Sequence, residues 1–460
     1  MTIVTIVRVE SVQLTGSGGK LMINSKLWRL LAIIFAVSLV AASCSSDSGT
    51  DTADGGDDAP AATDAPDDGD DDEPADTEAP DDTEAPAATD APAEDLEPVK
   101  IGLIAQDEEL FAFPEVRAAA EAYVAYLNAE QSGIDGHPVE LVICGAGDAP
   151  EGHVACAQEM VNDDSVHIVV TGGFLGNSAA ATPILSDAGK ATLTLGNDFV
   201  DYFVPNTYVF DPGLPGLAQV FFVFAAAEGI ETMSLFIADD PAFEPFIPVL
   251  EAIASSNGIT ITETIPLGFE PDLTGPVSAA DTANDSWLFV LGDGSQCSAA
   301  SAGVDTVGFE GRKFANDLCM GQDIVESGVL DGWSGPIVSS APTVDGKDIA
   351  EISRILDTYG GADAQTAGLS GWALASTQIA ADALSQAGAG DATDASVVDV
   401  MNSYSSDSIL GFPPVVCPGQ SAWTRACNTS PLMVTVVDGT MTTPDGFTTL
   451  DFSELDFLLE

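Results

Sequence analysis

Short apolar runs alternate with amphipathic stretches through residues 98–212, and the two patterns have different periods. The amphipathic stretches carry apolar residues at helical spacing, at 115–130, 151–162 and 183–188. The apolar runs are short and nearly uninterrupted, at 99–104, 139–144, 166–171 and 191–195. Apolar strands between helices are typical of a parallel sheet that is buried on both faces. The pattern therefore predicts a set of β-α-β units.

The same alternation starts again after residue 230. Strands are predicted at 233–238, 259–265, 287–291 and 313–315, with a helix at 246–255 between the first two. Two further helices are predicted at 349–359 and 372–387. The second group of strands predicts a second, separate sheet.

About 360 residues are too many for one ordinary core, so residues 98–460 should form two lobes. We predict an α/β fold in which each lobe is a mainly parallel sheet flanked by helices, with crossovers that act as a hinge. The first lobe is predicted at about 98–212 and 338–408, and the second at about 213–337 and 409–460.

The chain begins with the features of an export signal. Lys26 and Arg29 precede an unbroken apolar run at 30–40. Small residues at 41–43 then lead directly to Cys44. A basic stretch, a short apolar core and small residues make a secretory signal peptide, which is removed. The apolar run is too short for a membrane-spanning helix, which needs about 20 residues.

The sequence that ends on Cys44 resembles the lipobox of bacterial lipoproteins, in which small residues lead directly to a cysteine. The resemblance implies that residues 1–43 are removed and that Cys44 becomes the lipidated first residue of the mature protein. Met22 is an alternative start that would give a signal of ordinary length. The alternative interpretation is an ordinary signal peptide followed by an incidental cysteine.

Residues 44–97 have the composition of a tether. They are mainly Asp, Glu, Ala, Pro, Thr and Gly, without Lys or Arg. A Thr-Asp/Glu-Ala-Pro unit starts at Thr63, Thr77, Thr83 and Thr89. Such a segment buries too little apolar surface to offset the entropy of ordering, so we expect a disordered coil that reaches roughly 40 Å. Calcium binding is disfavoured, because no glycine-centred loop closed by a spaced Glu is present.

Negative charge dominates the composition, with 73 acidic and 12 basic residues. Twenty-two of the acidic and four of the basic residues precede residue 98, which leaves 51 acidic and 8 basic residues in the predicted domain. This excess excludes nucleic acid as a partner. Surface carboxylates with little lysine indicate adaptation to a salty medium. The alternative is an acidic cleft that attracts cations.

Six cysteines follow Cys44, and they fall in three neighbouring pairs. Six cysteines allow fifteen connectivities, which sequence alone does not distinguish. We favour the nearest-neighbour pairs, because each would close one loop: Cys144 with Cys156, Cys297 with Cys319, and Cys417 with Cys427. Disulfides persist in an oxidising compartment, in agreement with export. Zinc is disfavoured, because no Cys-x-x-Cys occurs and the three histidines are not paired with cysteines.

Three segments share their order and spacing with a known family. They are the strand at 99–104, the Gly-Ile-Asp-Gly turn and strand within 133–142, and the segment 163–172. The loop at 417–427 and the residues at 434–439 also match the tail of some members. The whole set resembles the type I periplasmic binding proteins, and among them the branched-chain amino-acid-binding (Leu/Ile/Val-binding-like) family of ABC importers.

The resemblance implies an extracytoplasmic solute-binding lipoprotein of an ABC importer. It would capture a small molecule, an amino acid or a related compound, by closure of two lobes. The expected partners are that ligand, the importer permease, and the cytoplasmic membrane, to whose outer face the lipid anchor holds the protein. We expect a monomer with no cofactor, no metal and no nucleic acid. The alternative is a ligand-sensing or surface-interaction lipoprotein of the same fold without transport.

The resemblance also implies where ligand binds, at the carboxyl ends of the strands, where helix N-termini and loop N–H groups hold an anionic group. The candidates of the first lobe are Asn177, Ser178, Gly196, Asn197 and Asp198. Asn177 and Ser178 could instead cap a helix, and Asp198 could be a surface turn residue. A carboxylate at Asp198 departs from the family pattern, which puts the usual orientation of an amino acid in question.

In the second lobe the candidates also follow strands, and they are Asp240, Phe243, Asp293, Ser295 and Asp317. Asp317 is the candidate partner for a ligand ammonium, because it lies near the acidic residue that has this role in the family. Phe111 and Phe113, in the loop after the first strand, could wall the cleft or simply pack.

Catalysis is not expected. The segment 368–371 lacks the spacing of a nucleophile elbow, and no phosphate-binding loop with lysine is present. His137, His153 and His167 fall at a turn, a helix start and a strand start, which are ordinary places for histidine.

Overall fold

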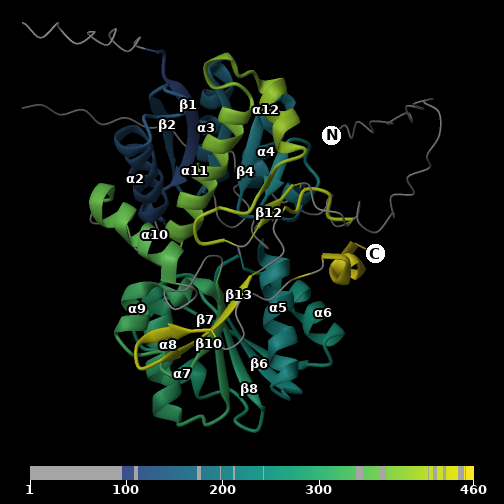
Figure 1. Cartoon of the computed structure of the whole chain (residues 1–460). Helices are drawn as coiled ribbons and strands as arrows, with labels where there is room; N and C mark the ends of the chain where they lie inside the picture. The colour runs from purple at the N-terminus through teal and green to yellow at the C-terminus, as the bar shows by residue number, and fades with distance from the viewer. Residues whose placement is uncertain are drawn as a thin grey trace, which may run out of the picture. The chain divides into compact units, whose positions relative to one another are not determined.

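Two large sheets, each with helices on both faces, form most of the part of the chain that the structure describes (Figure 1). The computed structural model describes residues 96–459 apart from 108–111, 173–177, 197, 211–212, 242, 338–345, 362–363, 365–368, 413, 418–421, 428–430, 444–449 and 451. These residues belong to one compact unit, Pro92–Leu459. No helix within the described ranges is long and apolar enough to cross a membrane. The predicted signal peptide and Cys44 lie outside them.

The first sheet contains parallel strands in the order β2-β1-β3-β4-β5. They are β1 (Val99–Gln106), β2 (Val139–Ala146), β3 (Val166–Thr171), β4 (Ala191–Thr194) and β5 (Thr207–Val209). Successive side chains of one strand pack on opposite faces of the sheet, in two different hydrophobic cores. In β3, Ile168 and Val170 pack on one face, and Val169 packs on the other. This two-sided burial explains why the strands are apolar runs in the sequence.

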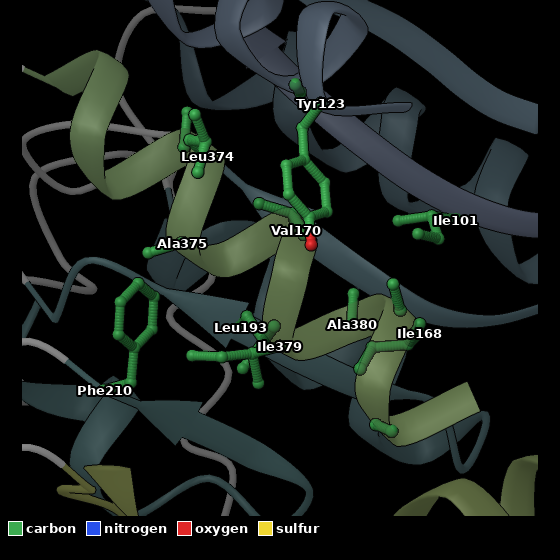
Figure 2. Packing of buried hydrophobic residues seen from close by; sticks show 14 of the residues in the cluster. Ile101, Tyr123, Ile168, Val170, Leu193, Phe210, Leu374, Ala375, Ile379 and Ala380 are labelled. Atoms are coloured by element: carbon green, nitrogen blue, oxygen red, sulfur yellow. The ribbon is translucent and has the colours of Figure 1, made fainter. Parts of the chain in front are cut away.

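Helices cover both faces of the first sheet. They are α2 (Pro114–Glu130), α3 (Pro150–Asn162), α4 (Ser178–Asp187), α10 (Gly346–Tyr359), α11 (Leu369–Gln386) and α12 (Asp394–Met401). The helices α2, α10, α11 and α12 pack in the larger core, and α3 and α4 pack in the smaller one. Figure 2 shows Ile379 of α11 beside Leu193 of β4 in the larger core.

The second sheet has the strand order β14-β13-β10-β9-β8-β6-β7. Its strands are β6 (Thr232–Ala238), β7 (Thr260–Leu267), β8 (Ser286–Val290), β9 (Arg312–Ala315), β10 (Ser334–Ile337), β13 (Leu432–Val437) and β14 (Thr440–Thr442). Strands β6 to β10 are parallel, whereas β13 runs antiparallel to β10, and β14 antiparallel to β13.

Helices also cover both faces of the second sheet. They are α5 (Gly213–Ala227), α6 (Phe246–Ser256), α7 (Thr274–Val277), α8 (Gly294–Val307) and α9 (Gln322–Glu326). Leu235 and Ile237 of β6 pack toward α5 and α6. Phe236 packs in the core that contains α7 and α8, where its ring stacks on Phe289 with 4.3 Å between centroids.

The predicted fold class is confirmed, because both sheets are mainly parallel and flanked by helices. The predicted strands and helices are present, and the largest shift of an end is at α4, which begins at Ser178 instead of 183. The sequence pattern missed α5 because that helix is apolar on almost all sides, so no helical period stands out. It missed α8 because the Gly, Ser and Ala residues there read as a loop.

The path of the chain after α12 differs from the predicted lobe boundary at 408/409. A small ribbon of β11 (Ser405–Ser406) and β12 (Val415–Val416) follows the helix. Ile409 and Cys417 pack in the core of the first sheet, and the chain joins the second sheet only at β13. The Val209 N–H of β5 donates to the Arg425 carbonyl at 2.9 Å, which holds Arg425 beside the first sheet. No periodic pattern in the sequence predicts this contact between β5 and Arg425.

Candidate functional site

A pocket lies in the second lobe between the sheet and helices α5 and α6. The centre of a water-sized sphere can move through about 60 Å³ of it, which is several times what one water molecule needs. Its walls are apolar apart from the polar side chains of Asn316 and Asp317. The lining residues are Leu214, Leu217, Ala218, Phe221, Phe243, Phe246, Leu250, Leu288, Val290, Ala315, Asn316, Asp317 and Pro336.

Side-chain bonds hold the loops in which β8 and β9 end. Asn316 donates to the Leu291 carbonyl at 2.9 Å and accepts from the Leu291 N–H at 3.1 Å. The disulfide between Cys297 and Cys319 fastens the following 3₁₀ helix, Asp317–Met320, to α8. Asp317 therefore has a fixed place at the carboxyl edge of parallel strands, where open α/β sheets bind their ligands.

Asp317 supplies the charge of the pocket. Among the described residues it has no ion-pair partner, and its side chain is partly buried. Loss of hydration raises the pKa of its carboxyl to about 6, against a smaller lowering by hydrogen bonds from the N–H groups of Asp317 and Leu318. A carboxylate that is poorly hydrated and has no counter-ion would gain from a cationic ligand group.

This raised pKa predicts that the empty protein loses stability as pH rises. The folded chain holds the proton with a pKa of about 6, against an ordinary value of 3.8. The stabilising protonation is therefore complete below the ordinary value and is lost as pH rises through about 6. Asparagine stays uncharged at every pH. Near pH 8 the Asp317→Asn variant should therefore be more stable than the parent chain, by up to about 3 kcal/mol.

Thermal unfolding of both chains between about pH 4 and pH 8 measures this difference. At the acid end the two Tm values should coincide. A Tm difference that stays constant with pH would show that Asp317 is not desolvated. The variant serves as the reference because low pH also reduces the repulsion among the many carboxylates of the chain. That effect changes the Tm of both chains alike.

Polar side chains of the first lobe surround the N-terminus of α4. Ser178 Oγ lies 2.6 Å from Oδ2 of Asp198 and 2.6 Å from Oδ2 of Asp201, and donates to one of them at a time. Asp198 Oδ2 also accepts the Ala179 N–H at 3.0 Å. Asp198 thus satisfies a free donor at the helix end and places negative charge where the helix dipole favours it.

Asp201, which the sequence analysis did not single out, is fully buried beside this helix end. Its carboxyl also accepts from Thr182 at 3.1 Å and Thr194 at 3.2 Å. Burial, followed by the nearby charge of Asp198, raises the pKa of the Asp201 carboxyl, and the three hydroxyl donors oppose this. No sequence signal could have found it, because an Asp in a short 3₁₀ turn looks like a surface turn residue.

Two other predicted residues of the first lobe have evident packing roles. Phe113 is buried in the larger core of the lobe, directly before α2. Gly196 has φ +68°, and a Cβ there would lie 2.3 Å from Val209 Cγ1 and 2.8 Å from the Tyr202 hydroxyl, so the backbone and the space both require glycine. Three predicted residues lie outside the described part of the chain: Phe111, Asn177 and Asn197.

In the second lobe the predicted residues separate into two groups. Asp293 is the N-cap of α8, because it accepts the Gln296 N–H at 2.8 Å and the Ser295 hydroxyl at 2.7 Å. Asp240 lies in the turn after β6, where its N–H donates to a backbone carbonyl. Phe243 and Asp317 line the pocket, whereas Asp240, Asp293 and Ser295 do not. Ligand contact by any of these residues stays a prediction.

Sequence reasoning missed most of the apolar wall. Leu217 and Phe221 lie one turn apart on α5, and Phe246 and Leu250 lie one turn apart on α6. The four-residue spacing on α6 could have identified its inner face, since that helix was predicted. No comparable signal was available for α5.

Three disulfides join cysteines of the described part of the chain, in the pairs that sequence proximity favoured. Cys144–Cys156 links β2 to α3, and Cys297–Cys319 links α8 to the 3₁₀ helix that carries Asp317. Cys417–Cys427 closes the loop after β12. Two of the three therefore restrain segments that leave the carboxyl ends of strands.

Solved structures share this architecture at low sequence identity. A solute-binding protein of an ABC transporter from R. palustris, in complex with 4-hydroxybenzoate, is 15% identical with a TM-score of 0.65, over 79% of this chain and 100% of that one. The branched-chain amino acid transporter substrate-binding protein from Streptococcus pneumoniae, in complex with isoleucine, is 14% identical with a TM-score of 0.63, over 77% and 100%. An ABC transporter substrate-binding protein from Desulfitobacterium hafniense, in complex with Leu, is 16% identical with a TM-score of 0.60, over 75% and 100%.

Comparison with sequence families identifies the described domain. No curated protein matches the chain. The family profile described as "Periplasmic binding protein" matches residues 98–429, which is most of the chain and includes both sheets as far as β10. The predicted family is therefore confirmed: the chain belongs to the periplasmic binding proteins and has their two-lobed type I fold.

Proposed function

We propose that residues 98–460 are the ligand-binding part of an ABC importer, which captures a small molecule and presents it to the permease. The pocket of the second lobe carries this proposal, because it combines an apolar cavity with one charged side chain at the strand exits. Two residues that the sequence indicated, Phe243 and Asp317, line it. The related structures with leucine, isoleucine and 4-hydroxybenzoate support a small ligand.

Closure of the two lobes on the ligand is the expected mechanism. The ligand would first enter the pocket beside Asp317 and then contact loops of the first lobe. Closure removes water from the site, which strengthens every polar contact inside it. Binding should therefore make the domain more compact, and small-angle scattering with and without ligand measures this change.

The test of the proposed function is recovery of a ligand. The chain is exported with Cys44→Ala, purified without added solute, and analysed by native mass spectrometry. We expect one bound small molecule per chain, and calorimetry with the released compound should give a Kd in the micromolar range or below, about −8 kcal/mol or stronger. Absence of any retained compound, together with no binding of amino acids, aromatic acids or amines, would contradict the proposal.

We further propose that the mature protein is anchored by lipid at Cys44, after export that its family membership supports. Cys44→Ala should move the protein from the membrane fraction to the aqueous fraction, because stable anchoring needs more than one acyl chain and the cysteine is the acylation point. Ser46→Ala is the matched control and should stay with the membrane. If the Cys44→Ala protein stays fully with the membrane, the anchor lies elsewhere.

A further inference from the structure

The pocket of the second lobe is suited to an apolar body that carries a positive charge. Its wall consists of side chains such as Phe221, Phe246 and Leu250, which offer no hydrogen bonds to a polar ligand. Asp317 meets this wall without an ion pair among the described residues. An ammonium group there would neutralise the carboxylate, whereas a ligand carboxylate would face a like charge in a site of low polarity.

The N-terminus of α4 in the first lobe, as far as the structure describes it, does not favour an anionic ligand group. A helix N-terminus ordinarily attracts an anion, but Asp198 already accepts the Ala179 N–H and lies 2.6 Å from the Ser178 hydroxyl. The carboxyl of Asp201 lies directly behind, at 2.6 Å from the same hydroxyl. A ligand carboxylate would have to displace one protein carboxylate and would still lie near a second.

Most basic side chains of the domain already have an acidic partner. Five of the eight in residues 98–460 lie within ion-pair distance of the protein's own carboxylates. The pairs are Lys100–Asp163, Arg117–Asp107, Lys190–Asp394, Arg312–Glu228 and Arg354–Glu130. Arg117 follows the exit of β1, in the first turn of α2, and its Nε lies 2.6 Å from Asp107 Oδ2. A ligand anion would therefore compete with an existing partner for this guanidinium.

We propose that the ligand is an apolar amine, or a similar organic cation, that carries no carboxylate. This inference rests on the proposed function and names the ligand class for the same pocket. The proposed ligand differs from those of the relatives solved with leucine, isoleucine and 4-hydroxybenzoate, because each of those three ligands carries a carboxylate. Two side chains account for this expected difference in ligand class: Asp198 at the helix end and Asp317 in the pocket.

Matched ligands test the charge while the apolar body stays the same. The chain exported with Cys44→Ala is titrated calorimetrically with 3-methylbutylamine, leucine and 4-methylpentanoate, which share one branched alkyl group. Benzylamine and benzoate form a second, aromatic pair. We expect each amine to bind at least ten-fold more tightly than its carboxylate-bearing counterparts. Native mass spectrometry of the same preparation identifies any compound that co-purifies.

The outcomes separate the ligand class from the proposed function. Leucine, 4-methylpentanoate or benzoate binding as tightly as its amine counterpart would overturn the ligand class and leave the solute-binding function standing. A co-purified compound that is neutral or carries a carboxylate would do the same, whereas a co-purified cation without a carboxylate would support the inference. If nothing co-purifies and none of the five compounds binds, the inference and the proposed function both fail.

Discussion

Replacing Asp317 with asparagine should weaken the binding of 3-methylbutylamine by tens-fold or more. Asparagine keeps the size and shape of the side chain, so the apolar wall of the pocket is left as it is. The variant loses the charge pair, and loss of a charged partner in a desolvated site costs roughly 2–5 kcal/mol. Calorimetry with the parent chain and the variant measures the difference. The empty variant should be at least as stable as the parent at neutral pH, because it no longer buries an unpaired charge.

Asp305→Asn is the matched control for this experiment. Asp305 is exposed on α8, which packs on the face of the second sheet opposite to α5 and α6. The control removes the same charge from the same lobe, and its affinity for the amine should equal that of the parent chain. Unchanged affinity in Asp317→Asn would exclude Asp317 from the site. An equal loss in both variants would assign the effect to the overall charge of the domain.

Removing the disulfide between Cys297 and Cys319 should reduce both stability and affinity. The bond closes a loop with a sequence separation of 22 residues, and a loop of that size stabilises by about 3 kcal/mol in the chain-entropy model. Cys319 lies two residues after Asp317 in the same 3₁₀ helix, so the double variant Cys297→Ser, Cys319→Ser should also hold Asp317 less firmly. We expect the amine to bind at least several-fold more weakly at a temperature where the variant is folded.

The double variant Cys144→Ser, Cys156→Ser provides the comparison. It removes a disulfide of the first lobe with a sequence separation of 12 residues, so its loss of stability should be similar. Because this bond restrains α3 and not the Asp317 segment, the affinity for the amine should be kept. Denaturant unfolding gives the stabilities, and calorimetry gives the affinities. Equal losses of affinity in the two variants would show that the Cys297–Cys319 bond does not position the site.

Much of the fold could be predicted because its strands are buried on both faces. The run 166–171 was predicted as a strand and forms β3 with the same ends, since an apolar run of that length between helices has few other structures. Helix α5 could not be predicted in this way, because burial on nearly all sides removes the polar stripe that marks a helix. The segment around Ile409 was predicted in the second lobe, whereas Ile409 packs in the core of the first sheet, because its partners are distant in the sequence.

The site could be predicted only in part, for a related reason. The ends of the strands can be predicted from the sequence, so Asp317 and Phe243 could be placed near the carboxyl edge of the sheet, where a ligand is expected. Asp293 follows a strand in the same way but caps α8, and nothing in the local sequence separates the two roles. The buried carboxyl of Asp201 depends on hydroxyls contributed by α4 and β4, which only the folded chain brings together.

The most direct measurement is a crystal structure of the chain exported with Cys44→Ala, grown with 3-methylbutylamine. We predict that the ligand nitrogen lies within ion-pair distance of the Asp317 carboxylate, about 4 Å or less. The alkyl group should lie against Phe221 and Phe243 in the apolar part of the pocket. An amine bound outside this pocket, or bound with its nitrogen away from Asp317, would contradict the assignment of the site.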